Sequence, residues 1–271
     1  MGNALFIVWR ESVEALLVIG ILWVWLKVQG EQRRGRWILS GGVAAGLLLA
    51  GLLAAAMTLV QDELAGAALE YFQAGMVLAA SALITHMVLW MMRHGRNMKR
   101  QLTAGADAAF SRGGALGIAV LVAIAVAREG AETAIFLYGL SFNGGSGLWL
   151  GAALGVVLAL ATAALLSRGL RYFSYATFFR ASSVLLLVLA CGLLVAGGEQ
   201  LIGLEALPVL IDPLWDSAFL LDDGAGLGNV LATFAGYRAR PSLLLLLVVA
   251  AYWLFVLWPR PSPVVAVAAG G

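Results

Sequence analysis

Two short motifs of the form R-E-x-x-E lie inside apolar runs of this sequence, and they carry the residue types that can bind a metal ion. The first motif spans residues 10–14 and the second spans residues 128–132. A charged side chain near the centre of a bilayer costs roughly 2.5 to 3.5 kcal/mol, so partners, water or a ligand must compensate each one. Two copies of the motif therefore predict one shared site.

The spacing within each motif places both carboxylates on one face of a helix. Glutamates at i and i+3 are neighbours on a helix surface, and the arginine lies one turn before the second glutamate. With a rise of ~1.5 Å per residue, both motifs lie near the midplane of a ~30 Å hydrocarbon layer. The candidate metal ligands are Glu11, Glu14, Glu129 and Glu132, and the candidate charge-balancing residues are Arg10 and Arg128.

Four carboxylates and two guanidinium groups leave a net charge of about −2, which attracts a cation. Oxygen ligands without a nearby cysteine or histidine favour hard ions such as ferric iron, manganese, magnesium or calcium over copper(I) or zinc. The ligand type does not choose among these hard ions. The alternative interpretation involves no substrate, because arginine–glutamate pairs can simply lock two helices together.

The composition requires a membrane environment for the helices that carry the motifs. Of the 271 residues, 62% are hydrophobic and 12% are charged, which is too little polar surface for a soluble globule of this size. The single cysteine, Cys191, excludes an intrachain disulfide and a thiolate metal cage. The sequence has no nucleic-acid-binding signal, no cofactor fingerprint and no nucleophile–base pair, so we expect neither an enzyme nor a bound cofactor. The first apolar run does not resemble a removable signal peptide.

Seven apolar runs are long enough to cross a membrane as helices, so the predicted fold class is all-α and polytopic. The loops after the first, third and fifth runs are basic. Counted with Arg260, they hold thirteen of the 17 lysines and arginines, whereas the opposite face has only Arg238 and Arg240. The asymmetry predicts an external N-terminus and an internal C-terminus. The seven runs are 4–27, 37–60, 68–92, 114–140, 147–167, 181–203 and 241–258.

The order of the runs predicts a single permease domain, 1–258, built from two inverted three-helix repeats at about 1–92 and 114–203. An external loop, 204–240, a seventh helix, 241–258, and a short cytoplasmic tail, 259–271, complete the chain. The first helix of each repeat carries R-E-x-x-E. The second helix of each repeat carries a G-x-x-x-G motif, Gly42/Gly46 and Gly151/Gly155, which lets helices approach closely.

Several other residues admit two interpretations. Glu70 and Glu199 are either entrance ligands that pass ions to the glutamates or residues at helix boundaries that face water. His86, Met87 and Met91 can be drawn as a soft-metal exit site, but packing is the commoner role of such residues. The acidic residues of the external loop can concentrate cations, or they can simply be solvated. Residues 95–113 are expected to form a short interfacial helix.

The two motifs resemble those of the oxidase-linked ferric iron permease family, which includes the fungal high-affinity iron permeases and the bacterial EfeU-type permeases. Both R-E-x-x-E motifs are complete here, and the resemblance spans about residues 1–258, including the final external loop. An acidic D-x-x-E motif of the fungal members is absent as such from the loop before the seventh helix. The resemblance implies transport of iron across the cytoplasmic membrane, membrane lipid as its surroundings, and a ferroxidase or peroxidase and an extracytoplasmic iron-binding protein as partners.

The sequence therefore predicts a high-affinity permease of the inner (plasma) membrane that moves ferric iron through four glutamates. Two alternatives remain open: a carrier of another metal ion such as ferrous iron, manganese or lead, and a membrane anchor for a redox partner that transports nothing. Charge counting favours a divalent ion over a ferric ion. A ferric ion fits if Glu70 or Glu199 joins the ligands, or if the ion arrives with bound hydroxide.

Overall fold

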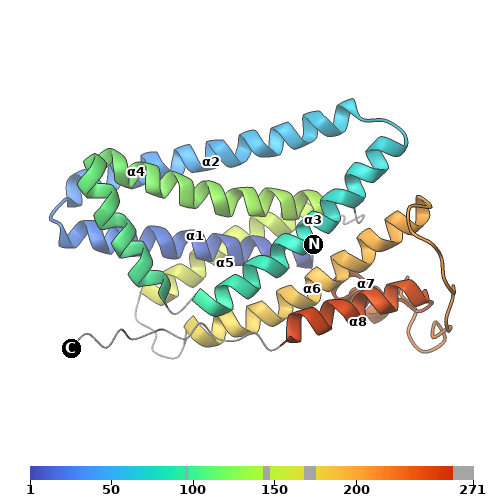
Figure 1. Ribbon diagram of the computed structural model, residues 1–271. Coiled ribbons are helices and arrows are strands. Elements are labelled where there is room, and N and C mark those ends of the chain that lie inside the picture. Colours follow the sequence, from blue (N-terminus) through green and yellow to red (C-terminus); the bar gives the residue numbers. More distant parts are fainter. Residues whose placement is uncertain (95–96, 143–146, 168–174, 259–271) are drawn as a thin grey trace, which may run out of the picture.

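The computed structural model describes residues 1–94, 97–142, 147–167 and 175–258, and no residue within these ranges lies in a β-strand (Figure 1). The predicted tail, 259–271, and most of the basic loop after the fifth apolar run lie outside the described residues. The helices are α1 (Gly2–Val28), α2 (Gln32–Glu63), α3 (Ala67–His94), α4 (Met98–Ser141), α5 (Leu148–Ser167), α6 (Tyr175–Gly203), α7 (Gly226–Ala235) and α8 (Leu243–Leu257).

Helices α1 to α6 and α8 coincide with the seven predicted runs, and five of them, α2 to α6, are long and apolar enough to cross a membrane. Helix α1 has the length but carries the charges of its motif. Helix α8 has 15 residues, or about 22 Å, which is short for a hydrocarbon layer of ~30 Å. The outward faces of α2 and α5 expose large apolar side chains such as Leu48 and Trp149. The chain is therefore a multi-pass membrane protein.

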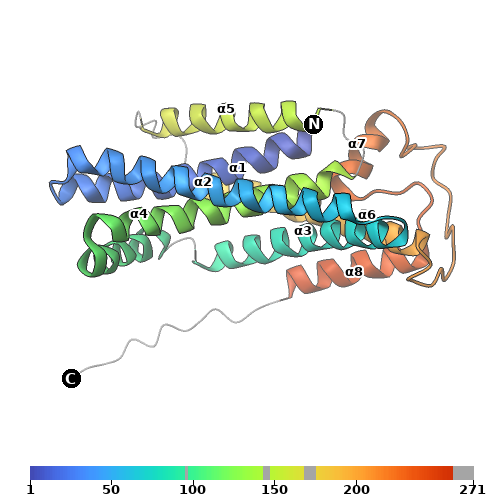
Figure 2. The same cartoon turned by 90° about the horizontal axis from the view of Figure 1, so that it is seen from above.

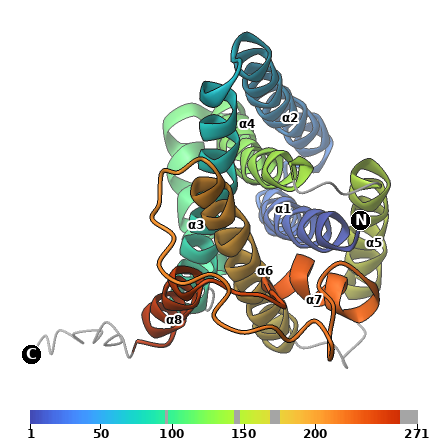
Figure 3. The same cartoon turned by 90° about the vertical axis from the view of Figure 1, so that its right-hand side faces the viewer.

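The helices α1 and α4 that carry the motifs lie next to each other in the middle of the bundle (Figure 3). Helix α5 packs on α1, and α2 packs on α4, so the second helix of each predicted repeat lies against the first helix of the other. Helices α3 and α6 pack on each other. Figure 2 shows α5 and α8 at opposite edges of the bundle.

The two G-x-x-x-G motifs lie at equivalent helix crossings. A Cβ atom added at Gly46 would lie 2.8 Å from the carbonyl oxygen of Ala123 on α4, and one at Gly155 would lie 2.7 Å from the carbonyl oxygen of Leu5 on α1. One turn earlier on α2, Gly42 also approaches α4, and one turn earlier on α5, Gly151 also approaches the start of α1. Any side chain at these glycines would push the helices apart, so the glycines set the distance between them.

Helix α4 bends sharply at Gly114, where φ is 54° and ψ is −134°, a conformation that glycine adopts most readily. The sequence predicts a separate short helix over residues 95–113, and the structure has a helical segment, 98–113, that this kink separates from the rest of α4 and that folds back toward α1 (Figure 1). The Trp25 indole donates a hydrogen bond of 2.9 Å to Asp107 Oδ1 and contacts the ring of Phe110 edge-on. These contacts fix the bent segment to the end of α1.

The predicted external loop is more ordered than the sequence indicates, because it contains α7. The chain leaves α7 through Gly236, whose φ of 71° places it in the left-handed region that ends many helices. The Asn3 side-chain amide donates a hydrogen bond of 3.1 Å to the Thr233 carbonyl. Arg238 pairs with Glu199 at the end of α6. The loop thus packs back onto the start of α1 and the end of α6.

Candidate metal centre

Three buried glutamates from α1 and α4 converge on one point. Carboxylate oxygens of Glu11, Glu14 and Glu129 all lie within 4.8 Å of one another, and these residues are 1%, 5% and 7% exposed. Helical spacing explains why: i and i+3 share a face of α1, and the close contact of α1 with α4 brings Glu129 to that face. The group is able to hold a cation with three oxygen ligands.

The fourth predicted ligand, Glu132, lies outside this group of three and pairs with the arginine of its own motif. Its Oε1 atom is 3.1 Å from Arg128 Nε, and its side chain is 17% exposed. In the sequence Glu132 follows Glu129 by about one turn of α4. Glu132 is therefore next to the group of three without belonging to it.

Arg10 is fully buried and is held by carboxylates of its own helix. Its Nη1 atom lies 3.0 Å from Glu11 Oε1, and its Nη2 atom lies 2.7 Å from Glu14 Oε1. Arg128 forms the same intrahelical pattern, with Nε at 3.6 Å from Glu129 and 3.1 Å from Glu132. The two arginines differ in burial, because the Arg128 side chain is 47% exposed. The Arg128 guanidinium also lies over an aromatic ring of α3, that of Trp90, at 5.4 Å from its centroid.

Each of the four glutamates has a buried carboxylate oxygen that no hydrogen bond satisfies. For Glu14 that atom is Oε1, which is within ion-pair distance of Arg10 without the alignment of a hydrogen bond. A buried acceptor without a donor is costly. A cation placed among the carboxylates would satisfy several of these oxygens at once.

The ion pairs within 4 Å join residues of the same helix, and Arg128 of α4 also attracts Glu14 of α1 across the interface. Three carboxylates also meet at this interface, with Glu11 and Glu14 of α1 facing Glu129 of α4. Like charges brought together in a buried site repel each other unless a cation lies between them. A cation in this position would offset part of that repulsion.

Two residues that the sequence favours as packing residues contact the site. The thioether sulfurs of Met87 and Met91 on α3 accept hydrogen bonds from Arg10 Nη1 and Nη2. In the sequence, the i, i+4 spacing of the two methionines is the one indication of this contact, because it places both sulfurs on one face of α3. His86 is exposed and instead lines a cavity of about 450 Å³ between α3, α6 and α8, to which none of the four glutamates contributes.

The two candidate entrance ligands lie outside the group of three carboxylates. Glu70 is exposed in the first turn of α3. Glu199 pairs with Arg238 of the external loop, and this contact raises the pKa of Arg238. Neither residue supplies a further charge to the glutamate cluster in this conformation.

Comparisons with known proteins agree with these features. The model of the iron permease FTR1 family matches residues 1–265. A ferrous iron permease EfeU of Escherichia coli O157:H7 is 32% identical over 243 residues, which cover 86% of each chain. A protein of the same name from Yersinia pestis is 31% identical over 279 aligned residues, covering 97% of this chain and 96% of the relative. No solved structure matches. This chain belongs to the FTR1 iron permease family.

Proposed function

We propose that this protein moves iron across the membrane through the glutamates of its two R-E-x-x-E motifs. Because the chain belongs to the iron permease FTR1 family, it belongs to the class of iron transporters. The observation that carries the proposed route is the convergence of Glu11, Glu14 and Glu129, with buried oxygens that no donor satisfies. Glu132 would become the fourth ligand of the ion once its ion pair with Arg128 breaks.

The oxidation state of the iron has two candidates. Ferric iron, which the sequence predicts, suits three hard carboxylate ligands. Ferrous iron is favoured by charge, because four carboxylates and two guanidinium groups leave about −2, and neither Glu70 nor Glu199 adds to that charge here. The relatives are also named ferrous iron permeases. Both ions have to be tested.

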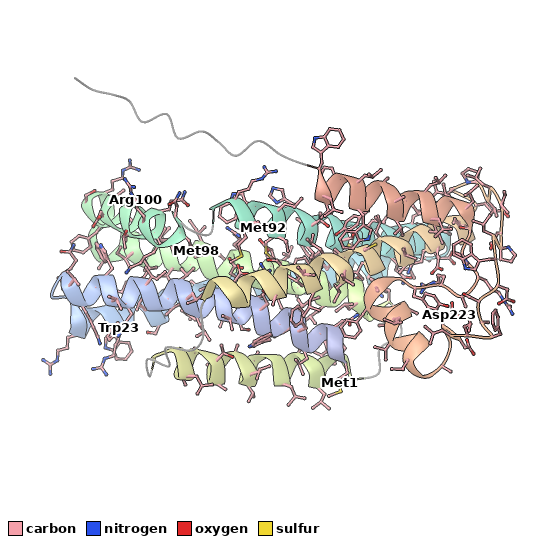
Figure 4. The ribbon with its side chains drawn as sticks, turned by 90° about the horizontal axis from the view of Figure 1, so that it is seen from below. Met1, Trp23, Met92, Met98, Arg100 and Asp223 are labelled. Atoms are coloured by element: carbon pink, nitrogen blue, oxygen red, sulfur yellow. The ribbon has the colours of Figure 1, made fainter. Side chains whose placement is uncertain are left out.

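The predicted inverted repeats and orientation are part of the proposal. The exchanged packing of α1 with α5 and of α4 with α2 supports two repeats related by a two-fold axis. Figure 4 places Arg100 near one end of the bundle and Asp223 near the other, which supports a basic cytoplasmic face and an acidic external face. We place the protein in the inner membrane. An oxidase or peroxidase and an extracytoplasmic iron-binding protein are its proposed partners.

Uptake into liposomes that contain only the purified protein tests the proposal. We expect iron to accumulate with the wild type and uptake to be abolished by Glu11→Gln or Glu129→Gln. Glu63→Gln is the matched control, because Glu63 is an exposed glutamate at the end of α2. Ferric citrate and ferrous ion under ascorbate are supplied separately, with manganese and lead as competitors.

The results of the uptake assay distinguish the proposed iron route from its alternatives. Saturable uptake of manganese or lead in preference to iron would identify a carrier of another metal. A wild type that moves no metal would identify a membrane anchor. Uptake that survives both Glu11→Gln and Glu129→Gln would place the route elsewhere in the protein.

A further inference from the structure

The buried guanidinium of Arg10 lies among four acceptor atoms from α1 and α3. Two are carboxylate oxygens, Glu11 Oε1 at 3.0 Å and Glu14 Oε1 at 2.7 Å. The other two are the thioether sulfurs of Met87 and Met91, which lie against Nη1 and Nη2. A cation held by two carboxylates and two thioethers occupies a position that also suits a metal ion.

The thioethers are the unusual members of this set. A thioether is a weak hydrogen-bond acceptor, and a guanidinium group binds most strongly to planar pairs of oxygens. Leucine would fill the same space at either position of α3 without placing a polar atom on the cation. Arg10, Met87 and Met91 are 0%, 4% and 6% exposed, so the sulfurs face the cation in a site closed to solvent.

We propose that Glu11, Glu14, Met87 and Met91 form a metal site that iron enters when the Arg10 guanidinium leaves, and that the two thioethers favour ferrous iron over ferric iron. The inference rests on the proposed iron-permease function and names the oxidation state of its substrate. Thioether sulfur is a soft ligand, which disfavours hard ions such as ferric iron, manganese and magnesium. The two carboxylates match the charge of a divalent ion.

The displaced guanidinium has a partner within reach of the same cluster. Glu129 supplies an oxygen within 4.8 Å of the Glu11 and Glu14 ligand atoms, and its Oε2 atom has no hydrogen-bond partner. Exchange of the guanidinium for the metal therefore keeps each buried charge near an opposite one. Arg10 acts as a tethered cation that holds the site until the metal arrives.

X-ray absorption of the full-length protein loaded anaerobically with Fe²⁺ tests the proposal directly. We expect sulfur in the first coordination shell of the wild type, and loss of that sulfur in the double variant Met87→Leu/Met91→Leu. Met92→Leu is the matched control, because Met92 is on the same helix and is 66% exposed. Cys191→Ala should keep the sulfur signal, which excludes the one thiol as its source.

Binding measurements on the same proteins separate a ligand from a packing role. The double variant should bind Fe²⁺ at least about tenfold more weakly, in the range that metal-site changes produce, and should bind Mn²⁺ as the wild type does. Equal weakening of both ions would show a packing role and overturn the inference.

The wild type provides outcomes of its own. An oxygen-only shell in a wild type that binds iron would overturn the inference and leave the proposed function in place. A wild type that binds no iron would overturn both. The wild-type and Cys191→Ala spectra decide the matter even if the double variant does not fold.

Discussion

Glu11 of α1 and Glu129 of α4 bring their carboxylate oxygens within 4.8 Å of each other across the interface between the two motif helices, while each is paired with the arginine of its own helix. Two ionised carboxylates at this separation would repel each other, and a cation between them would offset that repulsion. Removing one of the two charges should therefore separate stability from function.

Glu129→Gln should abolish iron binding while leaving the free energy of unfolding equal or higher. The substitution removes a like charge from the cluster and keeps the side-chain volume. Thermal unfolding in detergent, with and without Fe²⁺, measures both effects, because a bound ion stabilises the folded state. A marked loss of stability without metal would contradict the repulsion.

Glu14→Gln and Glu132→Gln should differ in their cost to folding. Glu14 pairs with a fully buried arginine, so its loss should lower the free energy of unfolding by about 3 kcal/mol. Glu132 pairs with Arg128, which is 47% exposed, so its loss should cost about 1 kcal/mol or less. Denaturation of the two variants side by side checks the order, and both should lose transport.

Arg128→Lys should impair uptake and leave expression near normal, because lysine keeps the charge but loses the planar fork that contacts two carboxylates. Arg10→Lys should be the more damaging change. Arg10 contacts two carboxylates and two sulfurs in a fully buried site, and an ammonium group cannot reach all four. Comparison of protein yield and iron uptake for the two variants tests this difference.

Gly46→Ala and Gly155→Ala should each destabilise the protein by about 1 to 3 kcal/mol, because the added methyl group overpacks a helix crossing. Gly51→Ala is the control on α2, where nothing lies within 4 Å of the added atom. It should be neutral or slightly stabilising. Equal effects at Gly46 and Gly51 would show that close packing is not needed at the crossing.

The topology is tested by cysteines at two positions near opposite ends of the bundle. Arg100→Cys should react only with reagents on the cytoplasmic side, and Asp223→Cys only with reagents outside, as the basic asymmetry predicts (Figure 4). The buried Cys191 should stay unlabelled. Labelling of both new cysteines from the same side would contradict the seven-helix arrangement.

The sequence predicts the helices well because long apolar runs leave the backbone no alternative to a helix in a membrane. It also identifies the residues of the glutamate cluster, since buried charges stand out against such runs. The fold of residues 204–240 is less predictable, because α7 depends on contacts such as Asn3 with Thr233. The contact of Met87 and Met91 with the buried arginine is also unpredictable from the sequence. Methionine is a common packing residue in apolar helices, and the sequence does not show which residue of another helix lies beside it.

The exchanged packing has a consequence for how the chain is made. Helix α1 ends at Val28, but α5, which covers it, begins at Leu148, about 120 residues later. At synthesis rates of roughly 5 to 20 residues per second, the face of α1 that carries Leu5 and Trp9 would wait on the order of ten seconds for that cover. During that interval the nascent protein depends on the insertion machinery, and a chain that stops after α3 should be a target for membrane proteases.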